Sequence, residues 1–296
     1  MDTEELDAYK TAGRIASEIR EWSKTLVKPG AGVLDIAEKI ESRIKELECG
    51  IAFPVNTCIN DVAAHYAPKF NDQTVIGEAD VVTVDLGVHV DGFIADTAYT
   101  MDLSGDYSEM LKANEEALEN AMGLVKPGVS VSEIGRTVKE TLVGDGFKPI
   151  ENLTGHEIKQ YDLHAGLSIP SIEVPYDWRI EEGMVLAIEP FATDGCGRVI
   201  ESKHAEIFSL LESKPTRMRE ARVLLNEVEK RKTLPFAGRW FAGKINPLRL
   251  SLVLRDLVSS EVLKAHPVLH EKEKGIVSQF EHTMIVTSDG CEVTTR

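Results

Sequence analysis

Two aspartates, Asp85 and Asp96, lie in apolar segments that are predicted to form a β-hairpin. Residues 79–90 and 93–101 are rich in β-branched and apolar residues, and Asp91-Gly92 between them is a strong turn signal. If the turn centres on Asp91-Gly92, the two aspartates are diagonal neighbours on one face of the hairpin. If it centres one residue earlier, they stand directly opposite each other. In either register the two carboxylates are about 5 to 8 Å apart.

Two carboxylates at that separation in a buried hairpin need a cation between them. Without one they would repel each other, and burying each charge would cost on the order of several kcal/mol of hydration free energy. A divalent metal ion satisfies both groups at once. The hairpin therefore predicts a metal site.

Other acids and histidines stand in comparable settings. Glu189 follows the apolar residues 185–188, and Glu281 lies within the largely apolar segment 279–286. Taken singly, each is typical of an edge-strand charge or an ion-pair partner, and His65, His156 and His164 are as typical of structural as of functional histidines. Together with the two aspartates they form an oxygen-rich set that suits two ions of Mn, Fe, Co or Zn better than a structural zinc.

An internal repeat indicates how one chain could bring these residues together. Residues 27–40 (VKPGAGVLDIAEKI) match residues 125–138 (VKPGVSVSEIGRTV) at six positions, including the Lys-Pro-Gly triplet, with a constant offset of 98. Each copy follows one helical stretch and opens another, because Pro-Gly forces a turn. Two related halves, with helices outside and strands inside, predict an α+β fold with pseudo-twofold symmetry and a site at the join.

One segment differs in charge from the rest of the chain. Residues 211–250 hold ten Lys/Arg against four acids, a net charge of +6 in a chain whose total is −16. Residues 217–230 and 248–263 have helical apolar spacing. We expect an inserted helical subdomain at 209–271, and a catalytic domain made of 1–208 and 272–296. The basic face of residues 211–250 is either simply solvated or a docking patch for an anionic partner such as ribosomal RNA.

Composition limits the remaining possibilities. A hydrophobic fraction of 43% and a charged fraction of 28% are those of a globular protein, and the net charge of −16 argues against nonspecific binding of nucleic acid or membrane. The four cysteines are scattered, which fits a reducing compartment. With no signal sequence and no apolar run of about 20 residues, we expect a cytoplasmic protein without membrane contact.

The candidate site residues stand within a series of short motifs. These are Phe53-Pro54, Ala64-His65-Tyr66, Val84-Asp85-Leu86-Gly87, Ile94-Ala95-Asp96, Gly155-His156, Leu163-His164-Ala165-Gly166, Ala187-Ile188-Glu189-Pro190-Phe191 and Gln279-Phe280-Glu281-His282-Thr283. The series closely resembles the type 2 methionine aminopeptidases over essentially the whole chain. The segment before the last acid resembles type 2 rather than type 1, and the lack of an N-terminal extension resembles the archaeal members.

The resemblance implies the pita-bread fold and a role for each site residue. Asp85 would be a terminal ligand of one metal, Asp96 and Glu281 would bridge both metals, and His156 and Glu189 would complete the second. The catalytic residues would be His65, His164 and Glu189, with the two histidines contacting the substrate. The methionine pocket would be lined by Phe53, Leu163, His204 and Leu269.

The implied activity is removal of the N-terminal methionine from nascent proteins and peptides, with a small second residue preferred. Two divalent ions (Co, Mn, Fe or Zn) would activate a bridging water as the nucleophile. Glu189 would carry its proton to the leaving amine. The expected partners are methionyl peptides and nascent chains, with a ribosome contact through residues 211–250, and the expected state is a monomer.

Two other functions remain open. A proline-directed aminopeptidase or prolidase would share the fold, but such relatives usually carry a separate N-terminal domain and extra histidines near the site. A pseudo-peptidase that binds RNA through the basic segment would have lost metal ligands, whereas all five ligand residues are present here.

Overall fold

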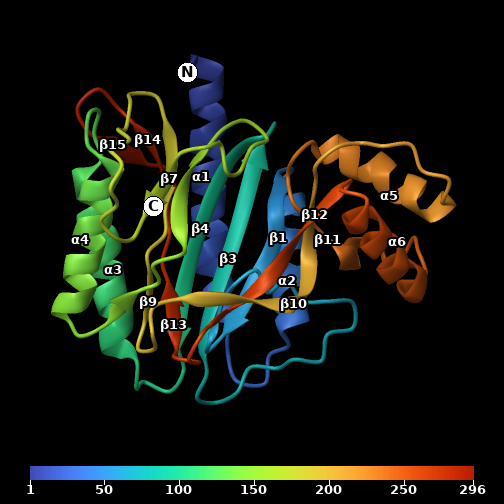
Figure 1. Ribbon diagram of the computed structural model, residues 1–296, viewed down its shortest axis with the longest axis horizontal. Helices are drawn as coiled ribbons and strands as arrows, with labels where there is room; N and C mark the ends of the chain where they lie inside the picture. The colour runs from blue at the N-terminus through green and yellow to red at the C-terminus, as the bar shows by residue number, and fades with distance from the viewer.

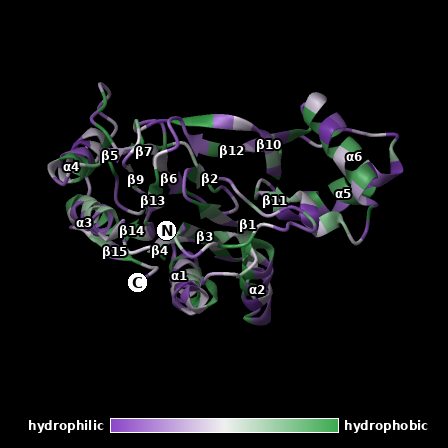
Figure 2. Cartoon of the chain, turned by 90° about the horizontal axis from the view of Figure 1, so that it is seen from below, coloured by the Kyte–Doolittle hydropathy of each residue, from purple (hydrophilic) through white to green (hydrophobic).

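Four long helices cover one side of the sheets in the computed structural model, which describes residues 1–296 (Figures 1 and 2). The first half of the chain contributes α1 (Thr3–Ser23) and α2 (Val33–Glu46), with a short 3-10 helix η1 (Lys24–Leu26) between them. The second half contributes α3 (Ser108–Leu124) and α4 (Val131–Gly144). None of the helices combines the length and the apolar character that crossing a bilayer requires.

The strands of the two halves follow their helices in sequence. The first half supplies β1 (Gly50–Ile59), β2 (Val62–Ala64), β3 (Val81–Val90) and β4 (Phe93–Asp102). The second half supplies β5 (Lys148–Pro149), β6 (Thr154–Ile158), β7 (Ser168–Pro170), β8 (Val185–Ile188), β9 (Phe191–Thr193) and β10 (Val199–Leu210). The chain ends with β13 (Val277–Gln279), β14 (His282–Val286) and β15 (Cys291–Val293). Within the apolar segment 279–286, β14 begins at His282, so Glu281 lies between β13 and β14.

The segment between β10 and β13 holds two further helices. Its elements are α5 (Arg219–Val228), η2 (Glu229–Arg231), β11 (Phe236–Ala237), η3 (Gly238–Phe241), α6 (Pro247–Ser259) and β12 (Leu263–Glu271). The two helices pack on a separate hydrophobic cluster of 14 buried residues and lie at one end of the molecule (Figure 1). The strand β12 pairs with β10 and also with β2 of the first half. The division at 209–271 stays a prediction.

Local sequence explains why the helices form where they do. Asp2 caps α1 in a reciprocal capping box with Glu5, in which each side chain accepts the other residue's backbone N–H. Along α2 the apolar residues recur three or four positions apart, so that one face is buried. These faces meet the sheets in a single cluster of 39 buried residues (Figure 2).

The internal repeat is reproduced in three dimensions. Gly30 and Gly128 both have positive φ values, +82° and +87°, as expected where a Pro-Gly turn ends one helix and starts the next. The Gly30 N–H donates to the Ile76 carbonyl, and the Gly128 N–H donates to the Ile180 carbonyl. The two halves therefore share the same turn, held by the same backbone pairing, and the predicted pseudo-twofold arrangement is confirmed.

The hairpin β3–β4 turns at Asp91-Gly92. Val90 pairs with Phe93, and both turn residues have positive φ values of +49° and +88°, which is the type I′ geometry. In this register Gly87 stands opposite Asp96, so the two site aspartates are diagonal neighbours. Of the two registers considered above, the turn chemistry selects the diagonal one.

Replacing Gly135 or Gly123 by alanine should change the stability of the protein in opposite directions. A Cβ atom at Gly135 in α4 would lie 2.1 Å from the Ile172 carbonyl oxygen, whereas one at Gly123 in α3 would meet nothing within 4 Å. We expect Gly135→Ala to destabilise the protein by about 2 kcal/mol or more through overpacking. Gly123→Ala should stabilise it by roughly 0.5 kcal/mol, because alanine loses less backbone entropy. Urea unfolding of both variants measures this, and equal midpoints would contradict the packing of α4 against β7.

Candidate dinuclear metal centre

The site residues come from both halves of the fold and meet at the seam between them. Asp85 and Asp96 lie on β3 and β4, His156 lies on β6, and Glu189 directly follows β8. Glu281 lies between β13 and β14 and forms an isolated bridge with Ala98 of β4. The structure therefore brings together all five residues that the sequence proposed as metal ligands.

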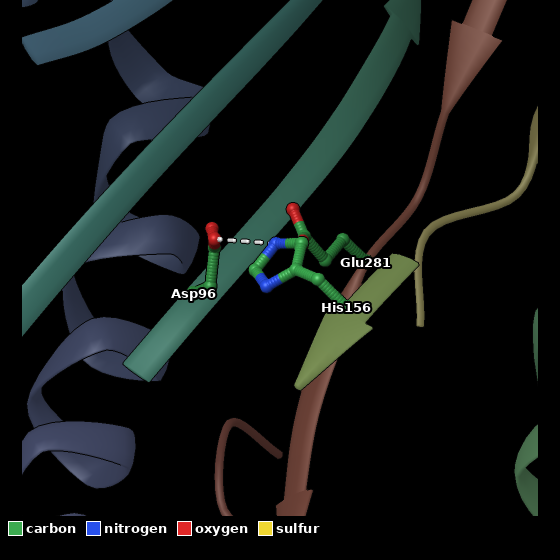
Figure 3. A group of neighbouring side chains, drawn as sticks. All are labelled: Asp96, His156 and Glu281. Atoms are coloured by element: carbon green, nitrogen blue, oxygen red, sulfur yellow. Dashed lines mark ion pairs between the residues drawn. The ribbon is translucent and has the colours of Figure 1, made fainter. Parts of the chain in front are cut away.

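Three of these side chains form a compact group (Figure 3). Asp96, His156 and Glu281 each offer a ligand atom, and these three atoms all lie within 4.8 Å of one another. His156 Nε2 is 3.6 Å from Asp96 Oδ2 and 3.6 Å from Glu189 Oε1. The arrangement can hold a metal ion, since histidine nitrogen and carboxylate oxygen converge on one point.

Hydrogen bonds across the seam fix the backbone of the site. The Asp96 N–H donates to the Thr283 hydroxyl, which in turn donates to the Asp96 carbonyl, both at 2.8 Å. The Thr97 hydroxyl donates to the Glu281 carbonyl at 2.8 Å. Asp96 and Glu281 are thereby held side by side although 185 positions of sequence separate them.

The site lacks positive charge of its own. No lysine or arginine side chain pairs with any of the four carboxylates, and Asp85 Oδ1, Asp96 Oδ1 and Glu281 Oε1 are buried without a hydrogen-bond partner. Buried polar atoms are normally satisfied, so partnerless carboxylate oxygens that face one another indicate a missing cation. The residues present fit divalent metal ions.

The pKa values of the carboxyl groups show how costly this arrangement is without a cation. Burial raises the pKa of Asp85 to about 7. Burial, with the charge of Asp85 and other neighbouring carboxylates, raises the pKa of Asp96, Glu189 and Glu281 well above the ordinary range. Bound cations would reverse these shifts and release protons.

Two histidines beside this group are held neutral. Burial lowers the pKa of His65, and its Nδ1 lies 3.1 Å from the Pro267 carbonyl, which can only accept a hydrogen bond. Nδ1 of His65 therefore carries the proton and Nε2 has a free lone pair. His164 reaches solvent, yet the dense packing around its ring, with His65 and Lys264 nearby, lowers its pKa to about 4.

A cavity of about 240 Å³ adjoins the carboxylates. Among the residues expected at the substrate pocket, Phe53, Leu163, His65 and His164 line it. His204, which is exposed on β10, and Leu269, which is buried and pairs with the cavity-lining Ala64, are not among the residues that line the cavity. Their assignment to the pocket stays a prediction.

Two amide side chains at the site were not singled out from the sequence. Gln279 Nε2 donates to Glu189 Oε2 at 3.1 Å and to Glu281 Oε2 at 3.4 Å, and Asn56 Nδ2 lies 3.5 Å from Asp85 Oδ2. The spacing could have indicated Gln279, because it stands two positions before Glu281 in an extended segment. Asn56 is opposite Asp85 in the β1–β3 pairing, which only the register reveals.

Comparison with known proteins agrees with this site. The model of metallopeptidase family M24 matches residues 7–288, and the chain belongs to that family. A methionine aminopeptidase of Pyrococcus horikoshii is 48% identical over 293 residues, which cover 98% of this chain and 99% of the relative. The sequence resemblance to archaeal type 2 methionine aminopeptidases is thus confirmed.

Solved structures confirm the fold. A methionine aminopeptidase of Thermotoga maritima superposes with a TM-score of 0.74 at 20% identity, covering 100% of this chain and 98% of that one. A thermophilic Arx1 gives a TM-score of 0.85 at 19% identity, covering 99% and 91%. At such identities the likeness concerns architecture alone, and it confirms the expected pita-bread fold.

The raised pKa of Asp85 predicts a pH-dependent stability in metal-free protein. Between about pH 4 and about pH 7 the folded protein keeps a proton that the unfolded chain, with an ordinary aspartate, releases. Stability from this group is therefore lost as the pH rises. Relative to Asp85→Asn, which cannot ionise, wild-type stability should fall by about 2 kcal/mol from roughly pH 5 to pH 8.

Chemical unfolding in a chelating buffer measures this difference. The exposed Asp289→Asn, which removes an acid outside this buried group, is the matched control. A flat profile for Asp85→Asn would mean that Asp85 is solvated and not part of a buried acidic group.

Proposed function

We propose that this chain is a metal-dependent methionine aminopeptidase that removes the N-terminal methionine from peptides and nascent proteins and prefers a small second residue. The observation that carries the proposal is the convergence of Asp85, Asp96, His156, Glu189 and Glu281 beside a cavity lined by Phe53 and Leu163. The 48% identity to a full-length relative named methionine aminopeptidase supports the choice of activity within the family.

Two divalent ions of Co, Mn, Fe or Zn would be held by the five residues. In this assignment Asp85 would hold one ion, Asp96 and Glu281 would serve both, and His156 and Glu189 would hold the other. When bound, such ions supply an activated water nucleophile and polarise the scissile carbonyl group. The partnerless oxygens of Asp85, Asp96 and Glu281 support this assignment, since each needs a cation or a donor.

Glu189 would move the proton from the attacking water to the leaving amine. Gln279 holds its Oε2 in place at 3.1 Å, which leaves Oε1 as the oxygen that can accept and return a proton. Bound cations would leave the Glu189 carboxyl group ionised, so that it could accept this proton and return it.

The two neutral histidines would orient the substrate. His65 presents the Nε2 lone pair, which can accept a hydrogen bond from an amine or amide N–H of the peptide. A neutral His164 can donate to the carbonyl oxygen as negative charge develops there. The positive φ of His65, +64°, is a strained conformation for a residue with a Cβ, as is common at functional sites.

The cavity supports a preference for methionine. Phe53 and Leu163 belong to one apolar cluster beside the carboxylates, and an unbranched thioether fits a narrow apolar slot. Because four carboxylates line this cavity, a free N-terminal amine would be bound beside them, and only the first residue would be placed for cleavage.

The inserted segment has a more limited role in the proposal. Two of its ten cations, Arg231 and Arg239, are turned inwards, whereas Arg217, Arg219 and Arg222 are exposed. A cytoplasmic, monomeric enzyme that contacts ribosomal RNA through these exposed residues remains part of the proposal, and salt-sensitive co-sedimentation with ribosomes tests it. The boundary of this subdomain at 209–271 is proposed on the separate cluster under α5 and α6.

Peptide hydrolysis by chelator-stripped protein tests the activity. With Co²⁺ or Mn²⁺ added, we expect methionine to be released from Met-Ala-Ser much faster than alanine from Ala-Pro-Ala, because the pocket favours a thioether. Release from Ala-Pro-Ala alone would move the protein to the proline-directed branch. No release of an amino acid from either peptide with any metal would indicate a binding protein instead of an enzyme.

Two single variants separate ligands from substrate contacts. Asp96→Ala should abolish turnover and lower the metal content, because it removes a bridging group. His65→Ala should lower turnover by about 100-fold or more while the metal content stays intact. Elemental analysis of both proteins decides, and loss of metal from His65→Ala would place that residue among the ligands.

A further inference from the structure

A short stretch of the inserted segment contacts two segments that line the substrate cavity, here called its two walls: residues 51–55, which carry Phe53, and residues 159–164, which carry Leu163. Residues 231–235, here called the connector, run from the last residue of η2 to the residue before β11. Pro235 at its end lines the cavity itself. The proposed catalytic mechanism assigns no role to the connector.

Arg231 ties the connector to the wall that carries Phe53. Its Nη2 donates to the carbonyl oxygens of Ile51 (2.8 Å), Ala52 (3.3 Å) and Pro235 (2.8 Å). These acceptors are the two residues before Phe53 and the cavity-lining proline itself. The guanidinium carbon also lies 4.9 Å from the centre of the Trp240 ring, so the side chain is fixed by stacking as well as by hydrogen bonds.

A buried glutamate also holds the wall that carries Phe53. Glu41 of α2 accepts hydrogen bonds from the Val55 N–H (3.3 Å) and from Trp240 Nε1 (2.8 Å), and it pairs with buried Arg239. Hydrogen bonds thus hold the segment from Ile51 to Val55 at both ends. It needs this support, because the β1–β3 pairing is irregular on either side of Phe53.

The connector also contacts the wall that carries Leu163. The Thr233 hydroxyl donates to the Tyr161 carbonyl, and the Lys232 ammonium lies 3.6 Å from the centre of the Tyr161 ring. Tyr161 stands two residues before Leu163. Between these anchors, Leu234 is 1% exposed and belongs to the cluster that contains both Phe53 and Leu163.

We propose that the connector sets the separation of the two cavity walls, and that Arg231 is a positioning residue for recognition of the first side chain of the substrate. The proposal rests on the proposed function for the identity of that side chain. Arg231 does not touch the carboxylates, so it should influence the fit of the side chain more than the chemical step.

Kinetics of Arg231→Met with paired substrates test this role. Methionine keeps an apolar stem but makes none of the three hydrogen bonds. We expect kcat/KM for Met-Ala-Ser to fall about tenfold, mostly through KM, while kcat/KM for Ala-Ala-Ser changes by less than about twofold. Arg231→Lys should restore part of the preference, because its ammonium can still donate to one or two of the carbonyls.

Arg255→Met, an exposed change in α6, is the matched control and should behave as wild type. A uniform loss on both peptides, or an unchanged ratio between them, would reduce Arg231 to a structural anchor and overturn the proposal. If Arg231→Met does not fold, Thr233→Val replaces it in the test. This variant removes only the hydrogen bond to the Tyr161 carbonyl, and it should lower the ratio of kcat/KM for Met-Ala-Ser to kcat/KM for Ala-Ala-Ser.

Hydrogen–deuterium exchange provides a readout that does not depend on activity. In metal-free protein, Arg231→Met should speed amide exchange in peptides covering 51–56 and 159–164, but not in peptides from α3. Unchanged exchange in both regions would overturn the proposal. If wild type released no methionine from any peptide, the proposed function would fail, and the exchange data would still decide whether the connector holds both walls.

Discussion

Repulsion among four buried carboxylates is the constraint on which the rest of this structure depends. Asp85, Asp96, Glu189 and Glu281 meet where no lysine or arginine compensates them, and burial raises the pKa of each. The fold has to keep them together against this repulsion until cations bind. It does so with backbone and hydroxyl contacts at the seam, where Thr97 and Thr283 join β4 to the segment around Glu281. Neutral groups therefore carry the structural task, and the charged groups stay free for cations.

The sequence predicted the parts of the fold that depend on local patterns. The repeat at an offset of 98 predicted two equivalent halves, because Pro29-Gly30 and Pro127-Gly128 impose the same turn wherever they occur. Asp91-Gly92 left two registers open, and the preference of such a pair for a type I′ turn decided between them. Residue type and the motif resemblance together were enough to select five residues that prove to be neighbours.

Long-range features were beyond the reach of the sequence. Asn56 meets Asp85 only because β1 pairs with β3 in a register interrupted by irregularities, and such shifts leave no local pattern. The same holds for the β10–β12 pairing, which is irregular around Ala205, next to the exposed His204. The buried group of Glu41, Arg239 and Trp240 joins α2 to the inserted segment across about 200 positions, and each residue alone is typical of an ordinary surface or core position.

Symmetry explains why this enzyme class would need more than its two repeated halves. A pseudo-twofold fold supplies ligands from both halves, which suits a pair of ions that share bridging carboxylates. A peptide, however, has a direction, and its side chain must be received on one side only. The cavity takes that asymmetry from residues that the repeat does not duplicate: Pro235 of the connector, His266 of β12 and Ile207 of β10 line it. His266 lies edge-on to His65 with ring centres 5.9 Å apart, so one of the unrepeated strands that line the cavity also contacts the histidine proposed to orient the substrate. In the proposed enzyme, metal binding is thus a property of the repeat, while selectivity comes from strands and a connector that the repeat does not duplicate.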